Sequence, residues 1–237
     1  MAKVLILSGA GISAESGIST FRDSGGLWEE YDISVVCNYD SLEKNEDITI
    51  EFYDKRRAEI EDKKPNYAHK VIKELKEKYP DDIAVITQNV DNLFEKAGMS
   101  AEDVIHLHGF MPTVRCRDEE CAKVYDIGYE ALETFNDGKC PECASKLRPN
   151  IVFFGEAAPM YEKLNAEIHD CEFFVVIGTS GNVIEVNSMA RYSKHSILNN
   201  LEPSNTIAER DFSKVIYDKA SNAIDIIADD IEAFLSE

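Results

Sequence analysis

The chain has 237 residues, of which 44% are hydrophobic and 30% charged, as expected for a globular protein with one sizeable core. Its 45 acidic side chains outnumber its 25 lysines and arginines, giving a formal net charge of −20. This charge argues against nucleic-acid binding, which requires clustered basic side chains. An acidic surface would attract basic protein segments, although solubility alone is a sufficient reason for it.

No apolar run reaches the roughly 18 residues that a membrane-spanning helix needs, and an apolar strand begins almost at Met1. We therefore expect a cytoplasmic protein without membrane contact. Six cysteines in such a chain indicate metal ligands and buried thiols rather than a disulfide framework.

The first motif is a Gly-rich turn at residues 9–18, directly after the apolar run of residues 4–7. Such a run is typical of a buried parallel strand, and small residues after it suit close approach of backbone to phosphate. The glycines alone could equally serve the topology of the turn. The aromatic ring, cation and carboxylate of residues 21–23 favour a nucleotide site, because a purely topological turn has no need of them.

Later apolar runs alternate with helical patterns. One helix is expected after Asn66, which can cap it, and another from Ser221 onward. The runs that indicate strands are residues 83–86, 104–107, 173–177, 197–198 and 215–217. This alternation predicts an α/β fold with a doubly wound, Rossmann-like parallel sheet and ligands at the carboxyl ends of its strands.

Two stretches interrupt the alternation and indicate a smaller inserted module with a cleft beside it. Residues 33–64 are rich in charge and contain a predicted helix around 50–60, and residues 111–148 carry four cysteines. The predicted large domain, which would bind a nucleotide, consists of residues 1–32, 65–110 and 149–237. The predicted small module, part helical and part zinc ribbon, consists of residues 33–64 and 111–148.

The four cysteines of this module form two short-spaced pairs, Cys116 with Cys121 and Cys140 with Cys143. Two such pairs are typical of a tetrahedral zinc site, and four thiolates leave no position open for water. We therefore predict one structural zinc ion. For Cys37 and Cys171, buried free thiols are expected.

Polar residues follow two of the predicted strands. Gln88, Asn89 and Asp91 come after one strand, where they could bind a ligand or cap a turn. His106 and His108 alternate along the next, so both are expected on one face, with Gly109 ending the strand. A histidine there suits proton transfer near neutral pH; for His106 we favour a structural hydrogen bond.

Together, the Gly-rich loop, Gln88 to Asp91 and His108-Gly109 resemble the sirtuins, the NAD-dependent protein-lysine deacylases. The resemblance implies that Asn89 and Asp91 contact the nicotinamide region and that His108 is the general base, with Asn89 also catalytic. It extends over nearly the whole chain and implies the following NAD-binding residues: Gly9, Ala10, Gly11, Ala14, Glu15, Phe21, Arg22, Trp28, Gln88, Asn89, Asp91, Gly178, Thr179, Ser180, Asn200, Leu201, Glu202 and Ala220.

Two further segments resemble sirtuin substrate sites. The apolar segment Val152, Phe153, Phe154, Gly155 and Glu156 is similar to the strand on which the substrate backbone is laid. Tyr53 and Arg56 lie three residues apart on the predicted helix and share a face. On their own they fit a solvated basic face with one anchored ring; as a pair they resemble the signature of the desuccinylases and demalonylases, bacterial type.

The implied function is NAD-dependent removal of acetyl, succinyl and malonyl groups from protein lysines, giving nicotinamide, O-acyl-ADP-ribose and free lysine. The alternatives are mono-ADP-ribosyl transfer to protein and a non-catalytic module that binds NAD and zinc. The expected partners are acylated lysines of proteins, without nucleic acid, and the expected state is a monomer. Residues 181–185 depart from the family pattern, which puts the substrate contacts of that loop in doubt.

Overall fold

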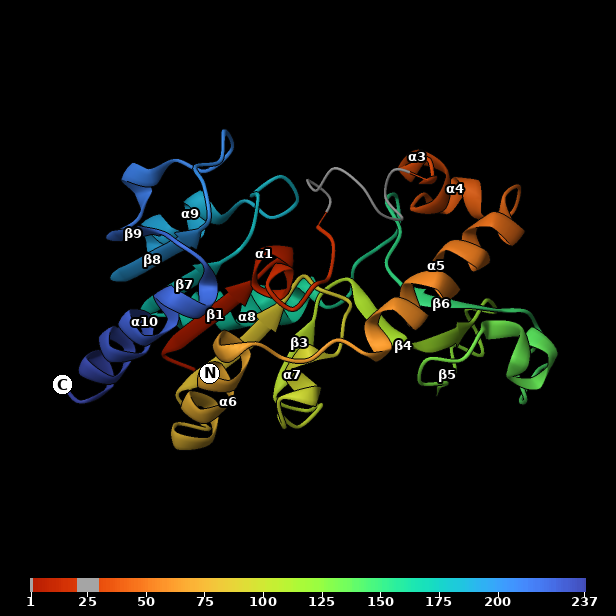
Figure 1. Ribbon diagram of the computed structural model, residues 1–237, viewed down its shortest axis with the longest axis horizontal. Helices are drawn as coiled ribbons and strands as arrows, with labels where there is room; N and C mark the ends of the chain where they lie inside the picture. Colours follow the sequence, from red (N-terminus) through yellow and green to blue (C-terminus); the bar gives the residue numbers. More distant parts are fainter. Residues whose placement is uncertain (1, 21–29) are drawn as a thin grey trace.

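A six-stranded parallel sheet is the centre of the computed structural model, which describes residues 2–20 and 30–237. Its strand order is β3-β2-β1-β7-β8-β9 (Figure 1). The strands are β1 (Val4–Ser8), β2 (Ile83–Thr87), β3 (Val104–His106), β7 (Phe173–Ile177), β8 (His195–Asn200) and β9 (Lys214–Tyr217). The order reverses between β1 and β7, and such a reversal opens a crevice at the carboxyl ends of the strands.

Helices cover both faces of this sheet. On one face, α6 (Tyr67–Lys78) and α10 (Ala220–Leu235) pack against Val4 and Ile6 of β1. On the other face, α8 (Tyr161–Asp170) and α9 (Val186–Tyr192) pack against Leu5 and Leu7. All five residues of β1 and of β7 are buried, which explains why these strands are continuously apolar. The predicted doubly wound sheet is confirmed.

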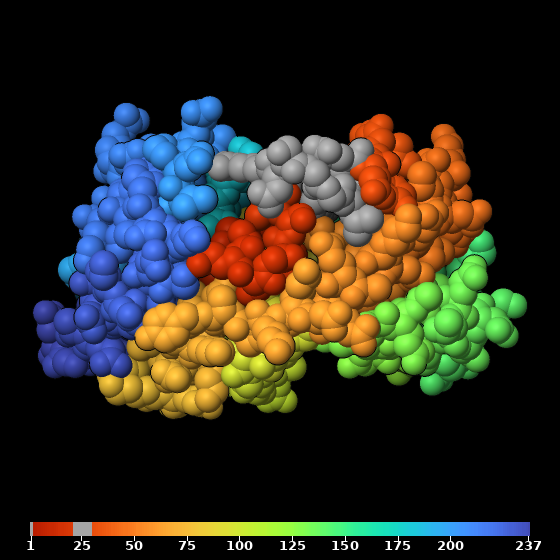
Figure 2. Space-filling model, in the orientation of Figure 1, coloured from red at the N-terminus to blue at the C-terminus, as the bar shows by residue number. Residues whose placement is uncertain are grey.

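A smaller part of the molecule combines an antiparallel sheet with three helices. The sheet has the order β5-β4-β6, with β4 at Gly109–Cys116, β5 at Val124–Asp126 and β6 at Leu147–Ile151. The helices are α3 (Ile33–Val36), α4 (Tyr39–Leu42) and α5 (Glu46–Glu61). Figure 2 shows the helical segment, in orange, beside the segment that forms the antiparallel sheet, in green, at one end of the molecule. Two short 3₁₀ helices, η1 (Leu132–Thr134) and η2 (Asn136–Gly138), lie between β5 and β6 of this part, and the short helices elsewhere are α1 (Ala10–Ala14), α7 (Leu93–Lys96) and η3 (Glu209–Asp211).

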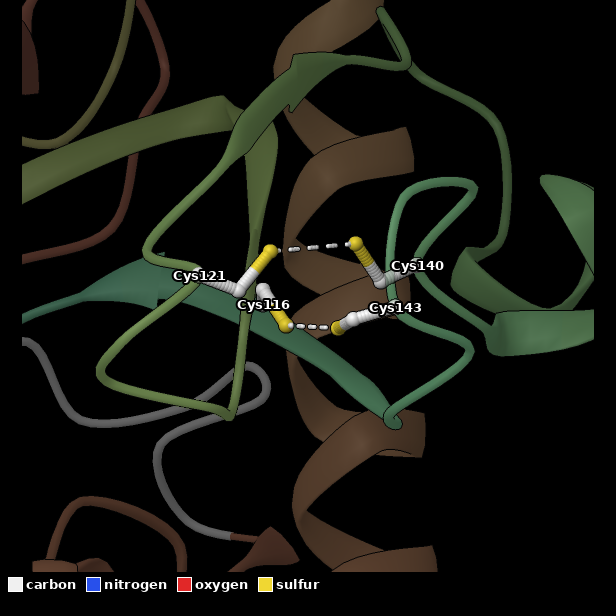
Figure 3. Close-up of side chains that lie close together, drawn as sticks. All are labelled: Cys116, Cys121, Cys140 and Cys143. Carbon is white, nitrogen blue, oxygen red and sulfur yellow. Dashed lines mark hydrogen bonds between the residues drawn. The ribbon is translucent and has the colours of Figure 1, made fainter.

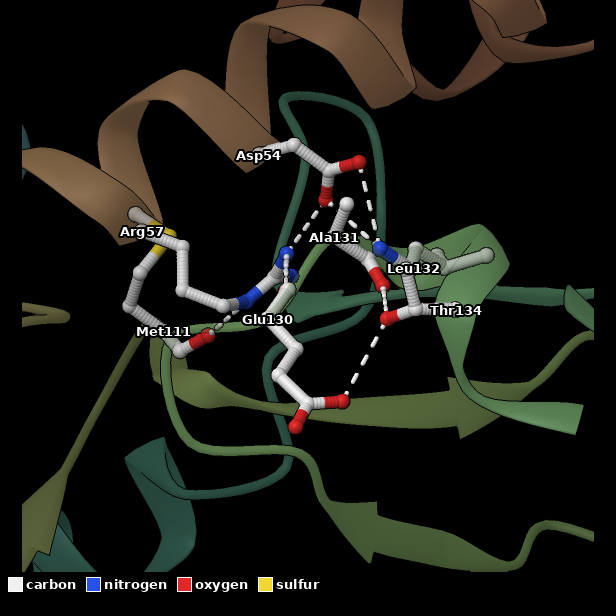
Figure 4. Close-up of polar contacts among 7 residues, drawn as sticks. All are labelled: Asp54, Arg57, Met111, Glu130, Ala131, Leu132 and Thr134. Atoms are coloured by element: carbon white, nitrogen blue, oxygen red, sulfur yellow. Dashed lines mark hydrogen bonds and ion pairs between the residues drawn. The ribbon is translucent and has the colours of Figure 1, made fainter.

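Arg57 fastens α5 to this sheet (Figure 4). Its side chain is fully buried; Nε donates to the Met111 carbonyl at 2.9 Å, and Nη1 pairs with Asp54. The Asp54 carboxylate also accepts the Leu132 amide at 3.1 Å. The charge of this buried guanidinium is matched by Asp54, and Nε and Nη1 have acceptors, whereas Nη2 is buried without a hydrogen-bond partner among the described residues. The orientation of α5 therefore depends on the cysteine-bearing segment.

The cap predicted for one helix is confirmed, whereas the strand end predicted at Gly109 is wrong. The Asn66 side chain caps α6 by accepting the Ala68 amide, as expected. However, β3 ends at His106, and Gly109 begins β4 instead of ending a strand. Gly109 has φ of +95°, and a Cβ there would lie 2.1 Å from the Asn150 carbonyl oxygen. The chain thus turns at residues 107–108 toward the second sheet, so strand alternation does not place His108.

Candidate active site

Three glycines bring the loops after β1 and β7 into direct contact. The Gly11 amide donates to the Gly178 carbonyl at 2.8 Å, and the Gly9 amide continues the ladder to Ile177 at 2.9 Å. A Cβ on Gly11 would lie 2.6 Å from the Gly178 Cα, and one on Gly9 would lie 2.8 Å from its carbonyl oxygen. The small residues are therefore needed for the contact between the two loops, next to the expected phosphate position.

A hydrogen-bond network joins the ends of β1 and β2. The Asn89 amide nitrogen donates to the Gly9 carbonyl at 3.1 Å and to the Ser13 hydroxyl at 3.0 Å. Ser13 in turn donates to the buried Asp91 carboxylate at 2.9 Å. Burial raises the pKa of Asp91, while the bonds from Leu93 and Ser13 oppose the rise. Asn89 and Asp91 are thus brought together, with Ser13 between them.

A second network crosses from β2 to β7 and β8. The Gln88 amide nitrogen donates to the Thr179 hydroxyl at 3.0 Å, and the Asn200 amide nitrogen donates to the Thr179 carbonyl at 2.9 Å. The Ser180 carbonyl accepts the Ser204 hydroxyl at 2.6 Å. Polar groups from separate strands therefore gather at one edge of the sheet, as the sequence predicts.

The far end of this edge involves residues close to the C-terminus. The Glu15 carboxylate accepts the Ser221 amide at 3.0 Å at the beginning of α10, beside the buried Ala220. By contrast, Leu201 and Glu202 are exposed, with Leu201 at 65%.

His108 is held between two strands' ends and α8. Its Nδ1 lies 2.9 Å from the Gln88 carbonyl oxygen, and its Nε2 lies 2.9 Å from the Tyr161 hydroxyl. A carbonyl can only accept, so the proton resides on Nδ1 and Nε2 carries the lone pair. Burial lowers the pKa of His108 below its ordinary value of 6.5, and the bond to Gln88 opposes this only in part. The ring is a neutral base at physiological pH.

His106 has a different environment. Its Nδ1 binds the Asn89 carbonyl and its Nε2 lies 2.9 Å from the Glu95 carboxylate. Burial lowers the pKa of His106, but the bond and charge of Glu95 outweigh it, so the net shift is upward. Both ring nitrogens are used in holding β2, β3 and α7 together, which agrees with the structural role expected for this residue.

Tyr53 and Arg56 lie on the buried side of α5, at 4% and 6% exposure. The Tyr53 hydroxyl is 3.6 Å from the Cys37 sulfur, and the Arg56 guanidinium is 3.9 Å from the Glu59 carboxylate. Burial lowers the pKa of Arg56, although nearby Glu59 and other groups counteract it. The two side chains therefore do not form the solvated basic face that is the other interpretation of their spacing.

The segment after β6 is extended but not a regular strand. Phe154 forms one parallel bridge with Asn38, and its amide donates to the Cys37 carbonyl at 2.8 Å. The Val152 amide donates to the His108 carbonyl, and the Phe153 amide to the Glu156 carboxylate. Glu156 also pairs with Arg148 at 2.7 Å. The expected strand is thus replaced by a turn around Gly155, whose φ is +90°.

The four cysteines of the small module converge on one point (Figure 3). Their sulfurs lie within 4.8 Å of one another, with 3.4 Å between Cys116 and Cys143 and 3.7 Å between Cys121 and Cys140. A tetrahedral ion with zinc–sulfur bonds of about 2.3 Å requires edges of roughly 3.8 Å. The four residues therefore fit a zinc ion and leave no position for a substrate. Cys37 and Cys171 are buried and free, as expected.

Comparison with known proteins identifies the family of this chain. A family model described as the Sir2 family matches residues 9–185. The chain is also 48% identical over 238 residues to an NAD-dependent protein deacylase of Campylobacter jejuni subsp. jejuni, with 100% of this chain and 99% of the relative covered. The chain belongs to the Sir2 family. A deacylase of Trypanosoma brucei brucei is 35% identical over 235 residues, covering 96% of this chain and 94% of the relative.

Solved structures of the Sir2 family share the fold. A Sir2 homologue in complex with ADP-ribose superposes with a TM-score of 0.84 at 31% identity, covering 99% of this chain and 94% of that one. A Sir2 homologue–NAD complex has a TM-score of 0.82 at 31% identity and covers 99% and 91%. The resemblance stated from the motifs is confirmed at the level of family and fold.

Some expected Sir2 site residues lie outside the described residues, and others were missed. Phe21, Arg22 and Trp28 fall within 21–29, which the structure does not describe. Ser13, Cys37 and Tyr161 were not predicted as partners of site residues. Ser13 lies within the Gly-rich loop directly after a strand, and this position could have indicated that it belongs to the site. The segment around Tyr161 carries no motif that indicates a role.

The loop that departs from the Sir2 pattern is a turn leading into α9. Gly181 has φ of +75°, and a Cβ there would lie 2.6 Å from Ile207. Glu185 caps α9 by accepting the Ser188 amide at 2.9 Å.

Among residues 2–20 and 30–237, every helix is too short or too polar to span a bilayer.

Proposed function

We propose that this chain is an NAD-dependent protein-lysine deacylase in which His108 is the general base. The observation that carries the proposal is the pair of contacts of the His108 ring, 2.9 Å from Nδ1 to the Gln88 carbonyl oxygen and 2.9 Å from Nε2 to the Tyr161 hydroxyl, which in a neutral ring assign the proton to Nδ1 and the lone pair to Nε2. A neutral imidazole with a depressed pKa accepts a proton at physiological pH. A module that only binds NAD and zinc has no need of such a base.

The described residues fit NAD. Amide, hydroxyl and carboxylate groups from Gln88, Asn89, Asp91, Thr179 and Asn200 gather at the carboxyl edge of the sheet, where dinucleotides bind in such folds. When bound, NAD would supply the reactive bond between ribose and nicotinamide. The chain's own residues position the reactants and exclude water. His108 accepts a proton at Nε2 from a ribose hydroxyl.

For the substrate, we propose that acylated lysines of proteins enter beside Gly155. The amides of Val152, Phe153 and Phe154 already have partners within the chain, so a substrate backbone would pair with the turn after them. Phe154 is 54% exposed and offers an apolar surface there. The role proposed for Glu156 is to hold this turn through Arg148 and the Phe153 amide.

For the acyl group, we propose that Tyr53 and Arg56 favour succinyl and malonyl lysine in addition to acetyl lysine. A planar guanidinium and a hydroxyl on one helix face can bind a carboxylate with charge-assisted hydrogen bonds. Both side chains are buried beside Cys37, so the carboxylate would be bound away from bulk water. We also propose a cytoplasmic monomer that binds no nucleic acid; the net charge of −20 supports the last point.

The test is incubation with NAD and matched acetyl-, succinyl- and malonyl-lysine peptides, with products resolved by mass. We expect nicotinamide, free lysine peptide and O-acyl-ADP-ribose. The His108→Ala variant should lose turnover by at least about 100-fold, the usual contribution of a general base, with ADP-ribose binding retained. His195→Ala, which removes an exposed histidine on β8, is the control.

Three outcomes would contradict the proposal. Full turnover by His108→Ala would remove this residue from the mechanism. Absence of nicotinamide release with all three peptides would favour a non-catalytic module. Label from NAD retained on protein would favour mono-ADP-ribosyl transfer.

A further inference from the structure

The partner of the His108 lone pair is a side chain of the protein itself. Because Nδ1 donates to Gln88, Nε2 can only accept, and the group 2.9 Å from it is the Tyr161 hydroxyl. The phenol is therefore the donor. Burial raises the pKa of Tyr161, so the hydroxyl keeps its proton at neutral pH.

The position of Tyr161 is fixed by the helix that it begins. Its amide donates to the Ala158 carbonyl at 3.1 Å, and Leu164, one turn later in α8, is fully buried against the sheet. The ring of Tyr161 packs against the same apolar cluster, which includes Leu5 and Leu7. The two ring centroids of Tyr161 and His108 are 5.9 Å apart at 33°, so the hydroxyl reaches Nε2 without a water between them.

We propose that Tyr161 caps the base: its hydroxyl occupies Nε2 of His108 in the ligand-free enzyme and is exchanged for a ribose hydroxyl when the cofactor binds. This inference rests on the proposed function, which assigns the proton transfer to Nε2. The nitrogen has one lone pair, so the phenol and the ribose cannot both be bonded to it. Exchange replaces one O–H···N bond with another of the same type, so its net cost is small.

The cap keeps His108 neutral and correctly oriented until the cofactor arrives. Two hydrogen bonds, one at each ring nitrogen, define the plane of the imidazole. His106 differs, because its Nε2 is paired with the Glu95 carboxylate, which a neutral hydroxyl would displace only at a larger cost. Of the two histidines, His108 therefore has the nitrogen that a ligand can take over.

The first test measures binding without turnover. ADP-ribose is titrated by calorimetry into the wild type, Tyr161→Phe and the control Tyr192→Phe, whose ring is 87% exposed. Removing a competing neutral hydrogen bond should tighten ADP-ribose binding by about threefold to tenfold in Tyr161→Phe, with no change in Tyr192→Phe. Tyr161→Leu, which lacks both ring and hydroxyl, should also bind more tightly. Unchanged or weaker binding in both Tyr161 variants would overturn the proposal.

The second test observes His108 directly by nitrogen NMR of the ligand-free protein. In Tyr161→Phe, the His108 Nε2 resonance should move toward the position of an unbonded imine nitrogen, with Nδ1 still protonated. An unchanged Nε2 resonance would show that the phenol is not its partner. Neither measurement depends on deacylation. If binding and the Nε2 resonance change as expected but the wild type is inactive, the proposed deacylase function is wrong and the cap stands. If the wild type is active but neither quantity changes, the cap is wrong and the proposed function stands.

Discussion

The Tyr53 hydroxyl lies 3.6 Å from the Cys37 sulfur, joining α5 to the end of α3. Phe153 contacts the same ring, at 5.5 Å between centroids, and the Cys37 carbonyl accepts the Phe154 amide. One buried contact thus links the proposed acyl-binding helix to the proposed substrate segment. Burial raises the pKa of Cys37, with Tyr53 opposing the rise, so the sulfur remains a thiol.

Arg56→Met tests the acyl preference that this arrangement implies. Loss of a charge-assisted hydrogen bond should reduce kcat/KM for succinyl-lysine peptide by about 10- to 100-fold, since such bonds contribute roughly 1.5–3 kcal/mol. Deacetylation should change by less than about threefold, because an acetyl group has no carboxylate. Lys55→Met, on the exposed side of the same helix, is the control. Equal loss of both activities would mean that Arg56 is structural.

The pH dependence of deacylation should follow His108. Burial lowers the pKa of this residue, and only the neutral ring is a base. As the pH falls, kcat/KM should therefore stay constant through pH 6.5 and decline only at a more acidic value. The measurement is a profile of kcat/KM from pH 4.5 to 8 with one acyl peptide. A decline centred above pH 6.5 would contradict the environment described for this ring.

Glu95→Gln should destabilise the protein more at pH 6 than at pH 9. The pKa of His106 is raised, because Glu95 outweighs burial, so the folded state holds a proton more tightly than the unfolded state. Such stabilisation is present below the unfolded pKa of about 6.5 and is lost as pH rises through the folded pKa. We expect a difference on the order of 1 kcal/mol in the free energy of unfolding.

Urea unfolding at the two pH values measures this effect. Glu77→Gln is the matched control, since it removes a carboxylate paired with Lys73 on the exposed surface of α6. An equal loss of stability at both pH values in Glu95→Gln would show that Glu95 does not stabilise the protonated form of His106.

Zinc removal should loosen both the small module and α5. The four cysteines share one position, and α5 is fastened to that module through Arg57 and by the Glu46 carboxylate, which pairs with Arg117 at 2.8 Å. Treatment with a chelator should lower the melting temperature by on the order of 10 °C and reduce deacylation. Added zinc should restore both.

Cys143→Ser should reduce the bound zinc measured by elemental analysis, whereas Cys171→Ser, which changes a buried free cysteine at the end of α8, should not. Retention of one zinc per chain by Cys143→Ser would contradict the four-cysteine site.

Much of the fold could be predicted from local patterns. The strands β1, β2 and β7 are continuous apolar runs because both of their faces are covered, and Asn66 caps α6 through a bond only two residues away. His108 could not be placed in this way. Its position depends on a turn forced by Gly109 against Asn150, which is distant in the sequence.

The sequence by itself determined the doubly wound sheet, the pairs of cysteines and the polar ends of the strands, because each arises from spacing within a short segment. Only the tertiary structure decided which groups meet: Ser13 between Asn89 and Asp91, and Tyr161 on the lone pair of His108. The physical reason is that hydrogen bonds and nearby charges determine which of these side chains carries a proton. The residues that form these hydrogen bonds are 53 to 78 positions apart in the chain.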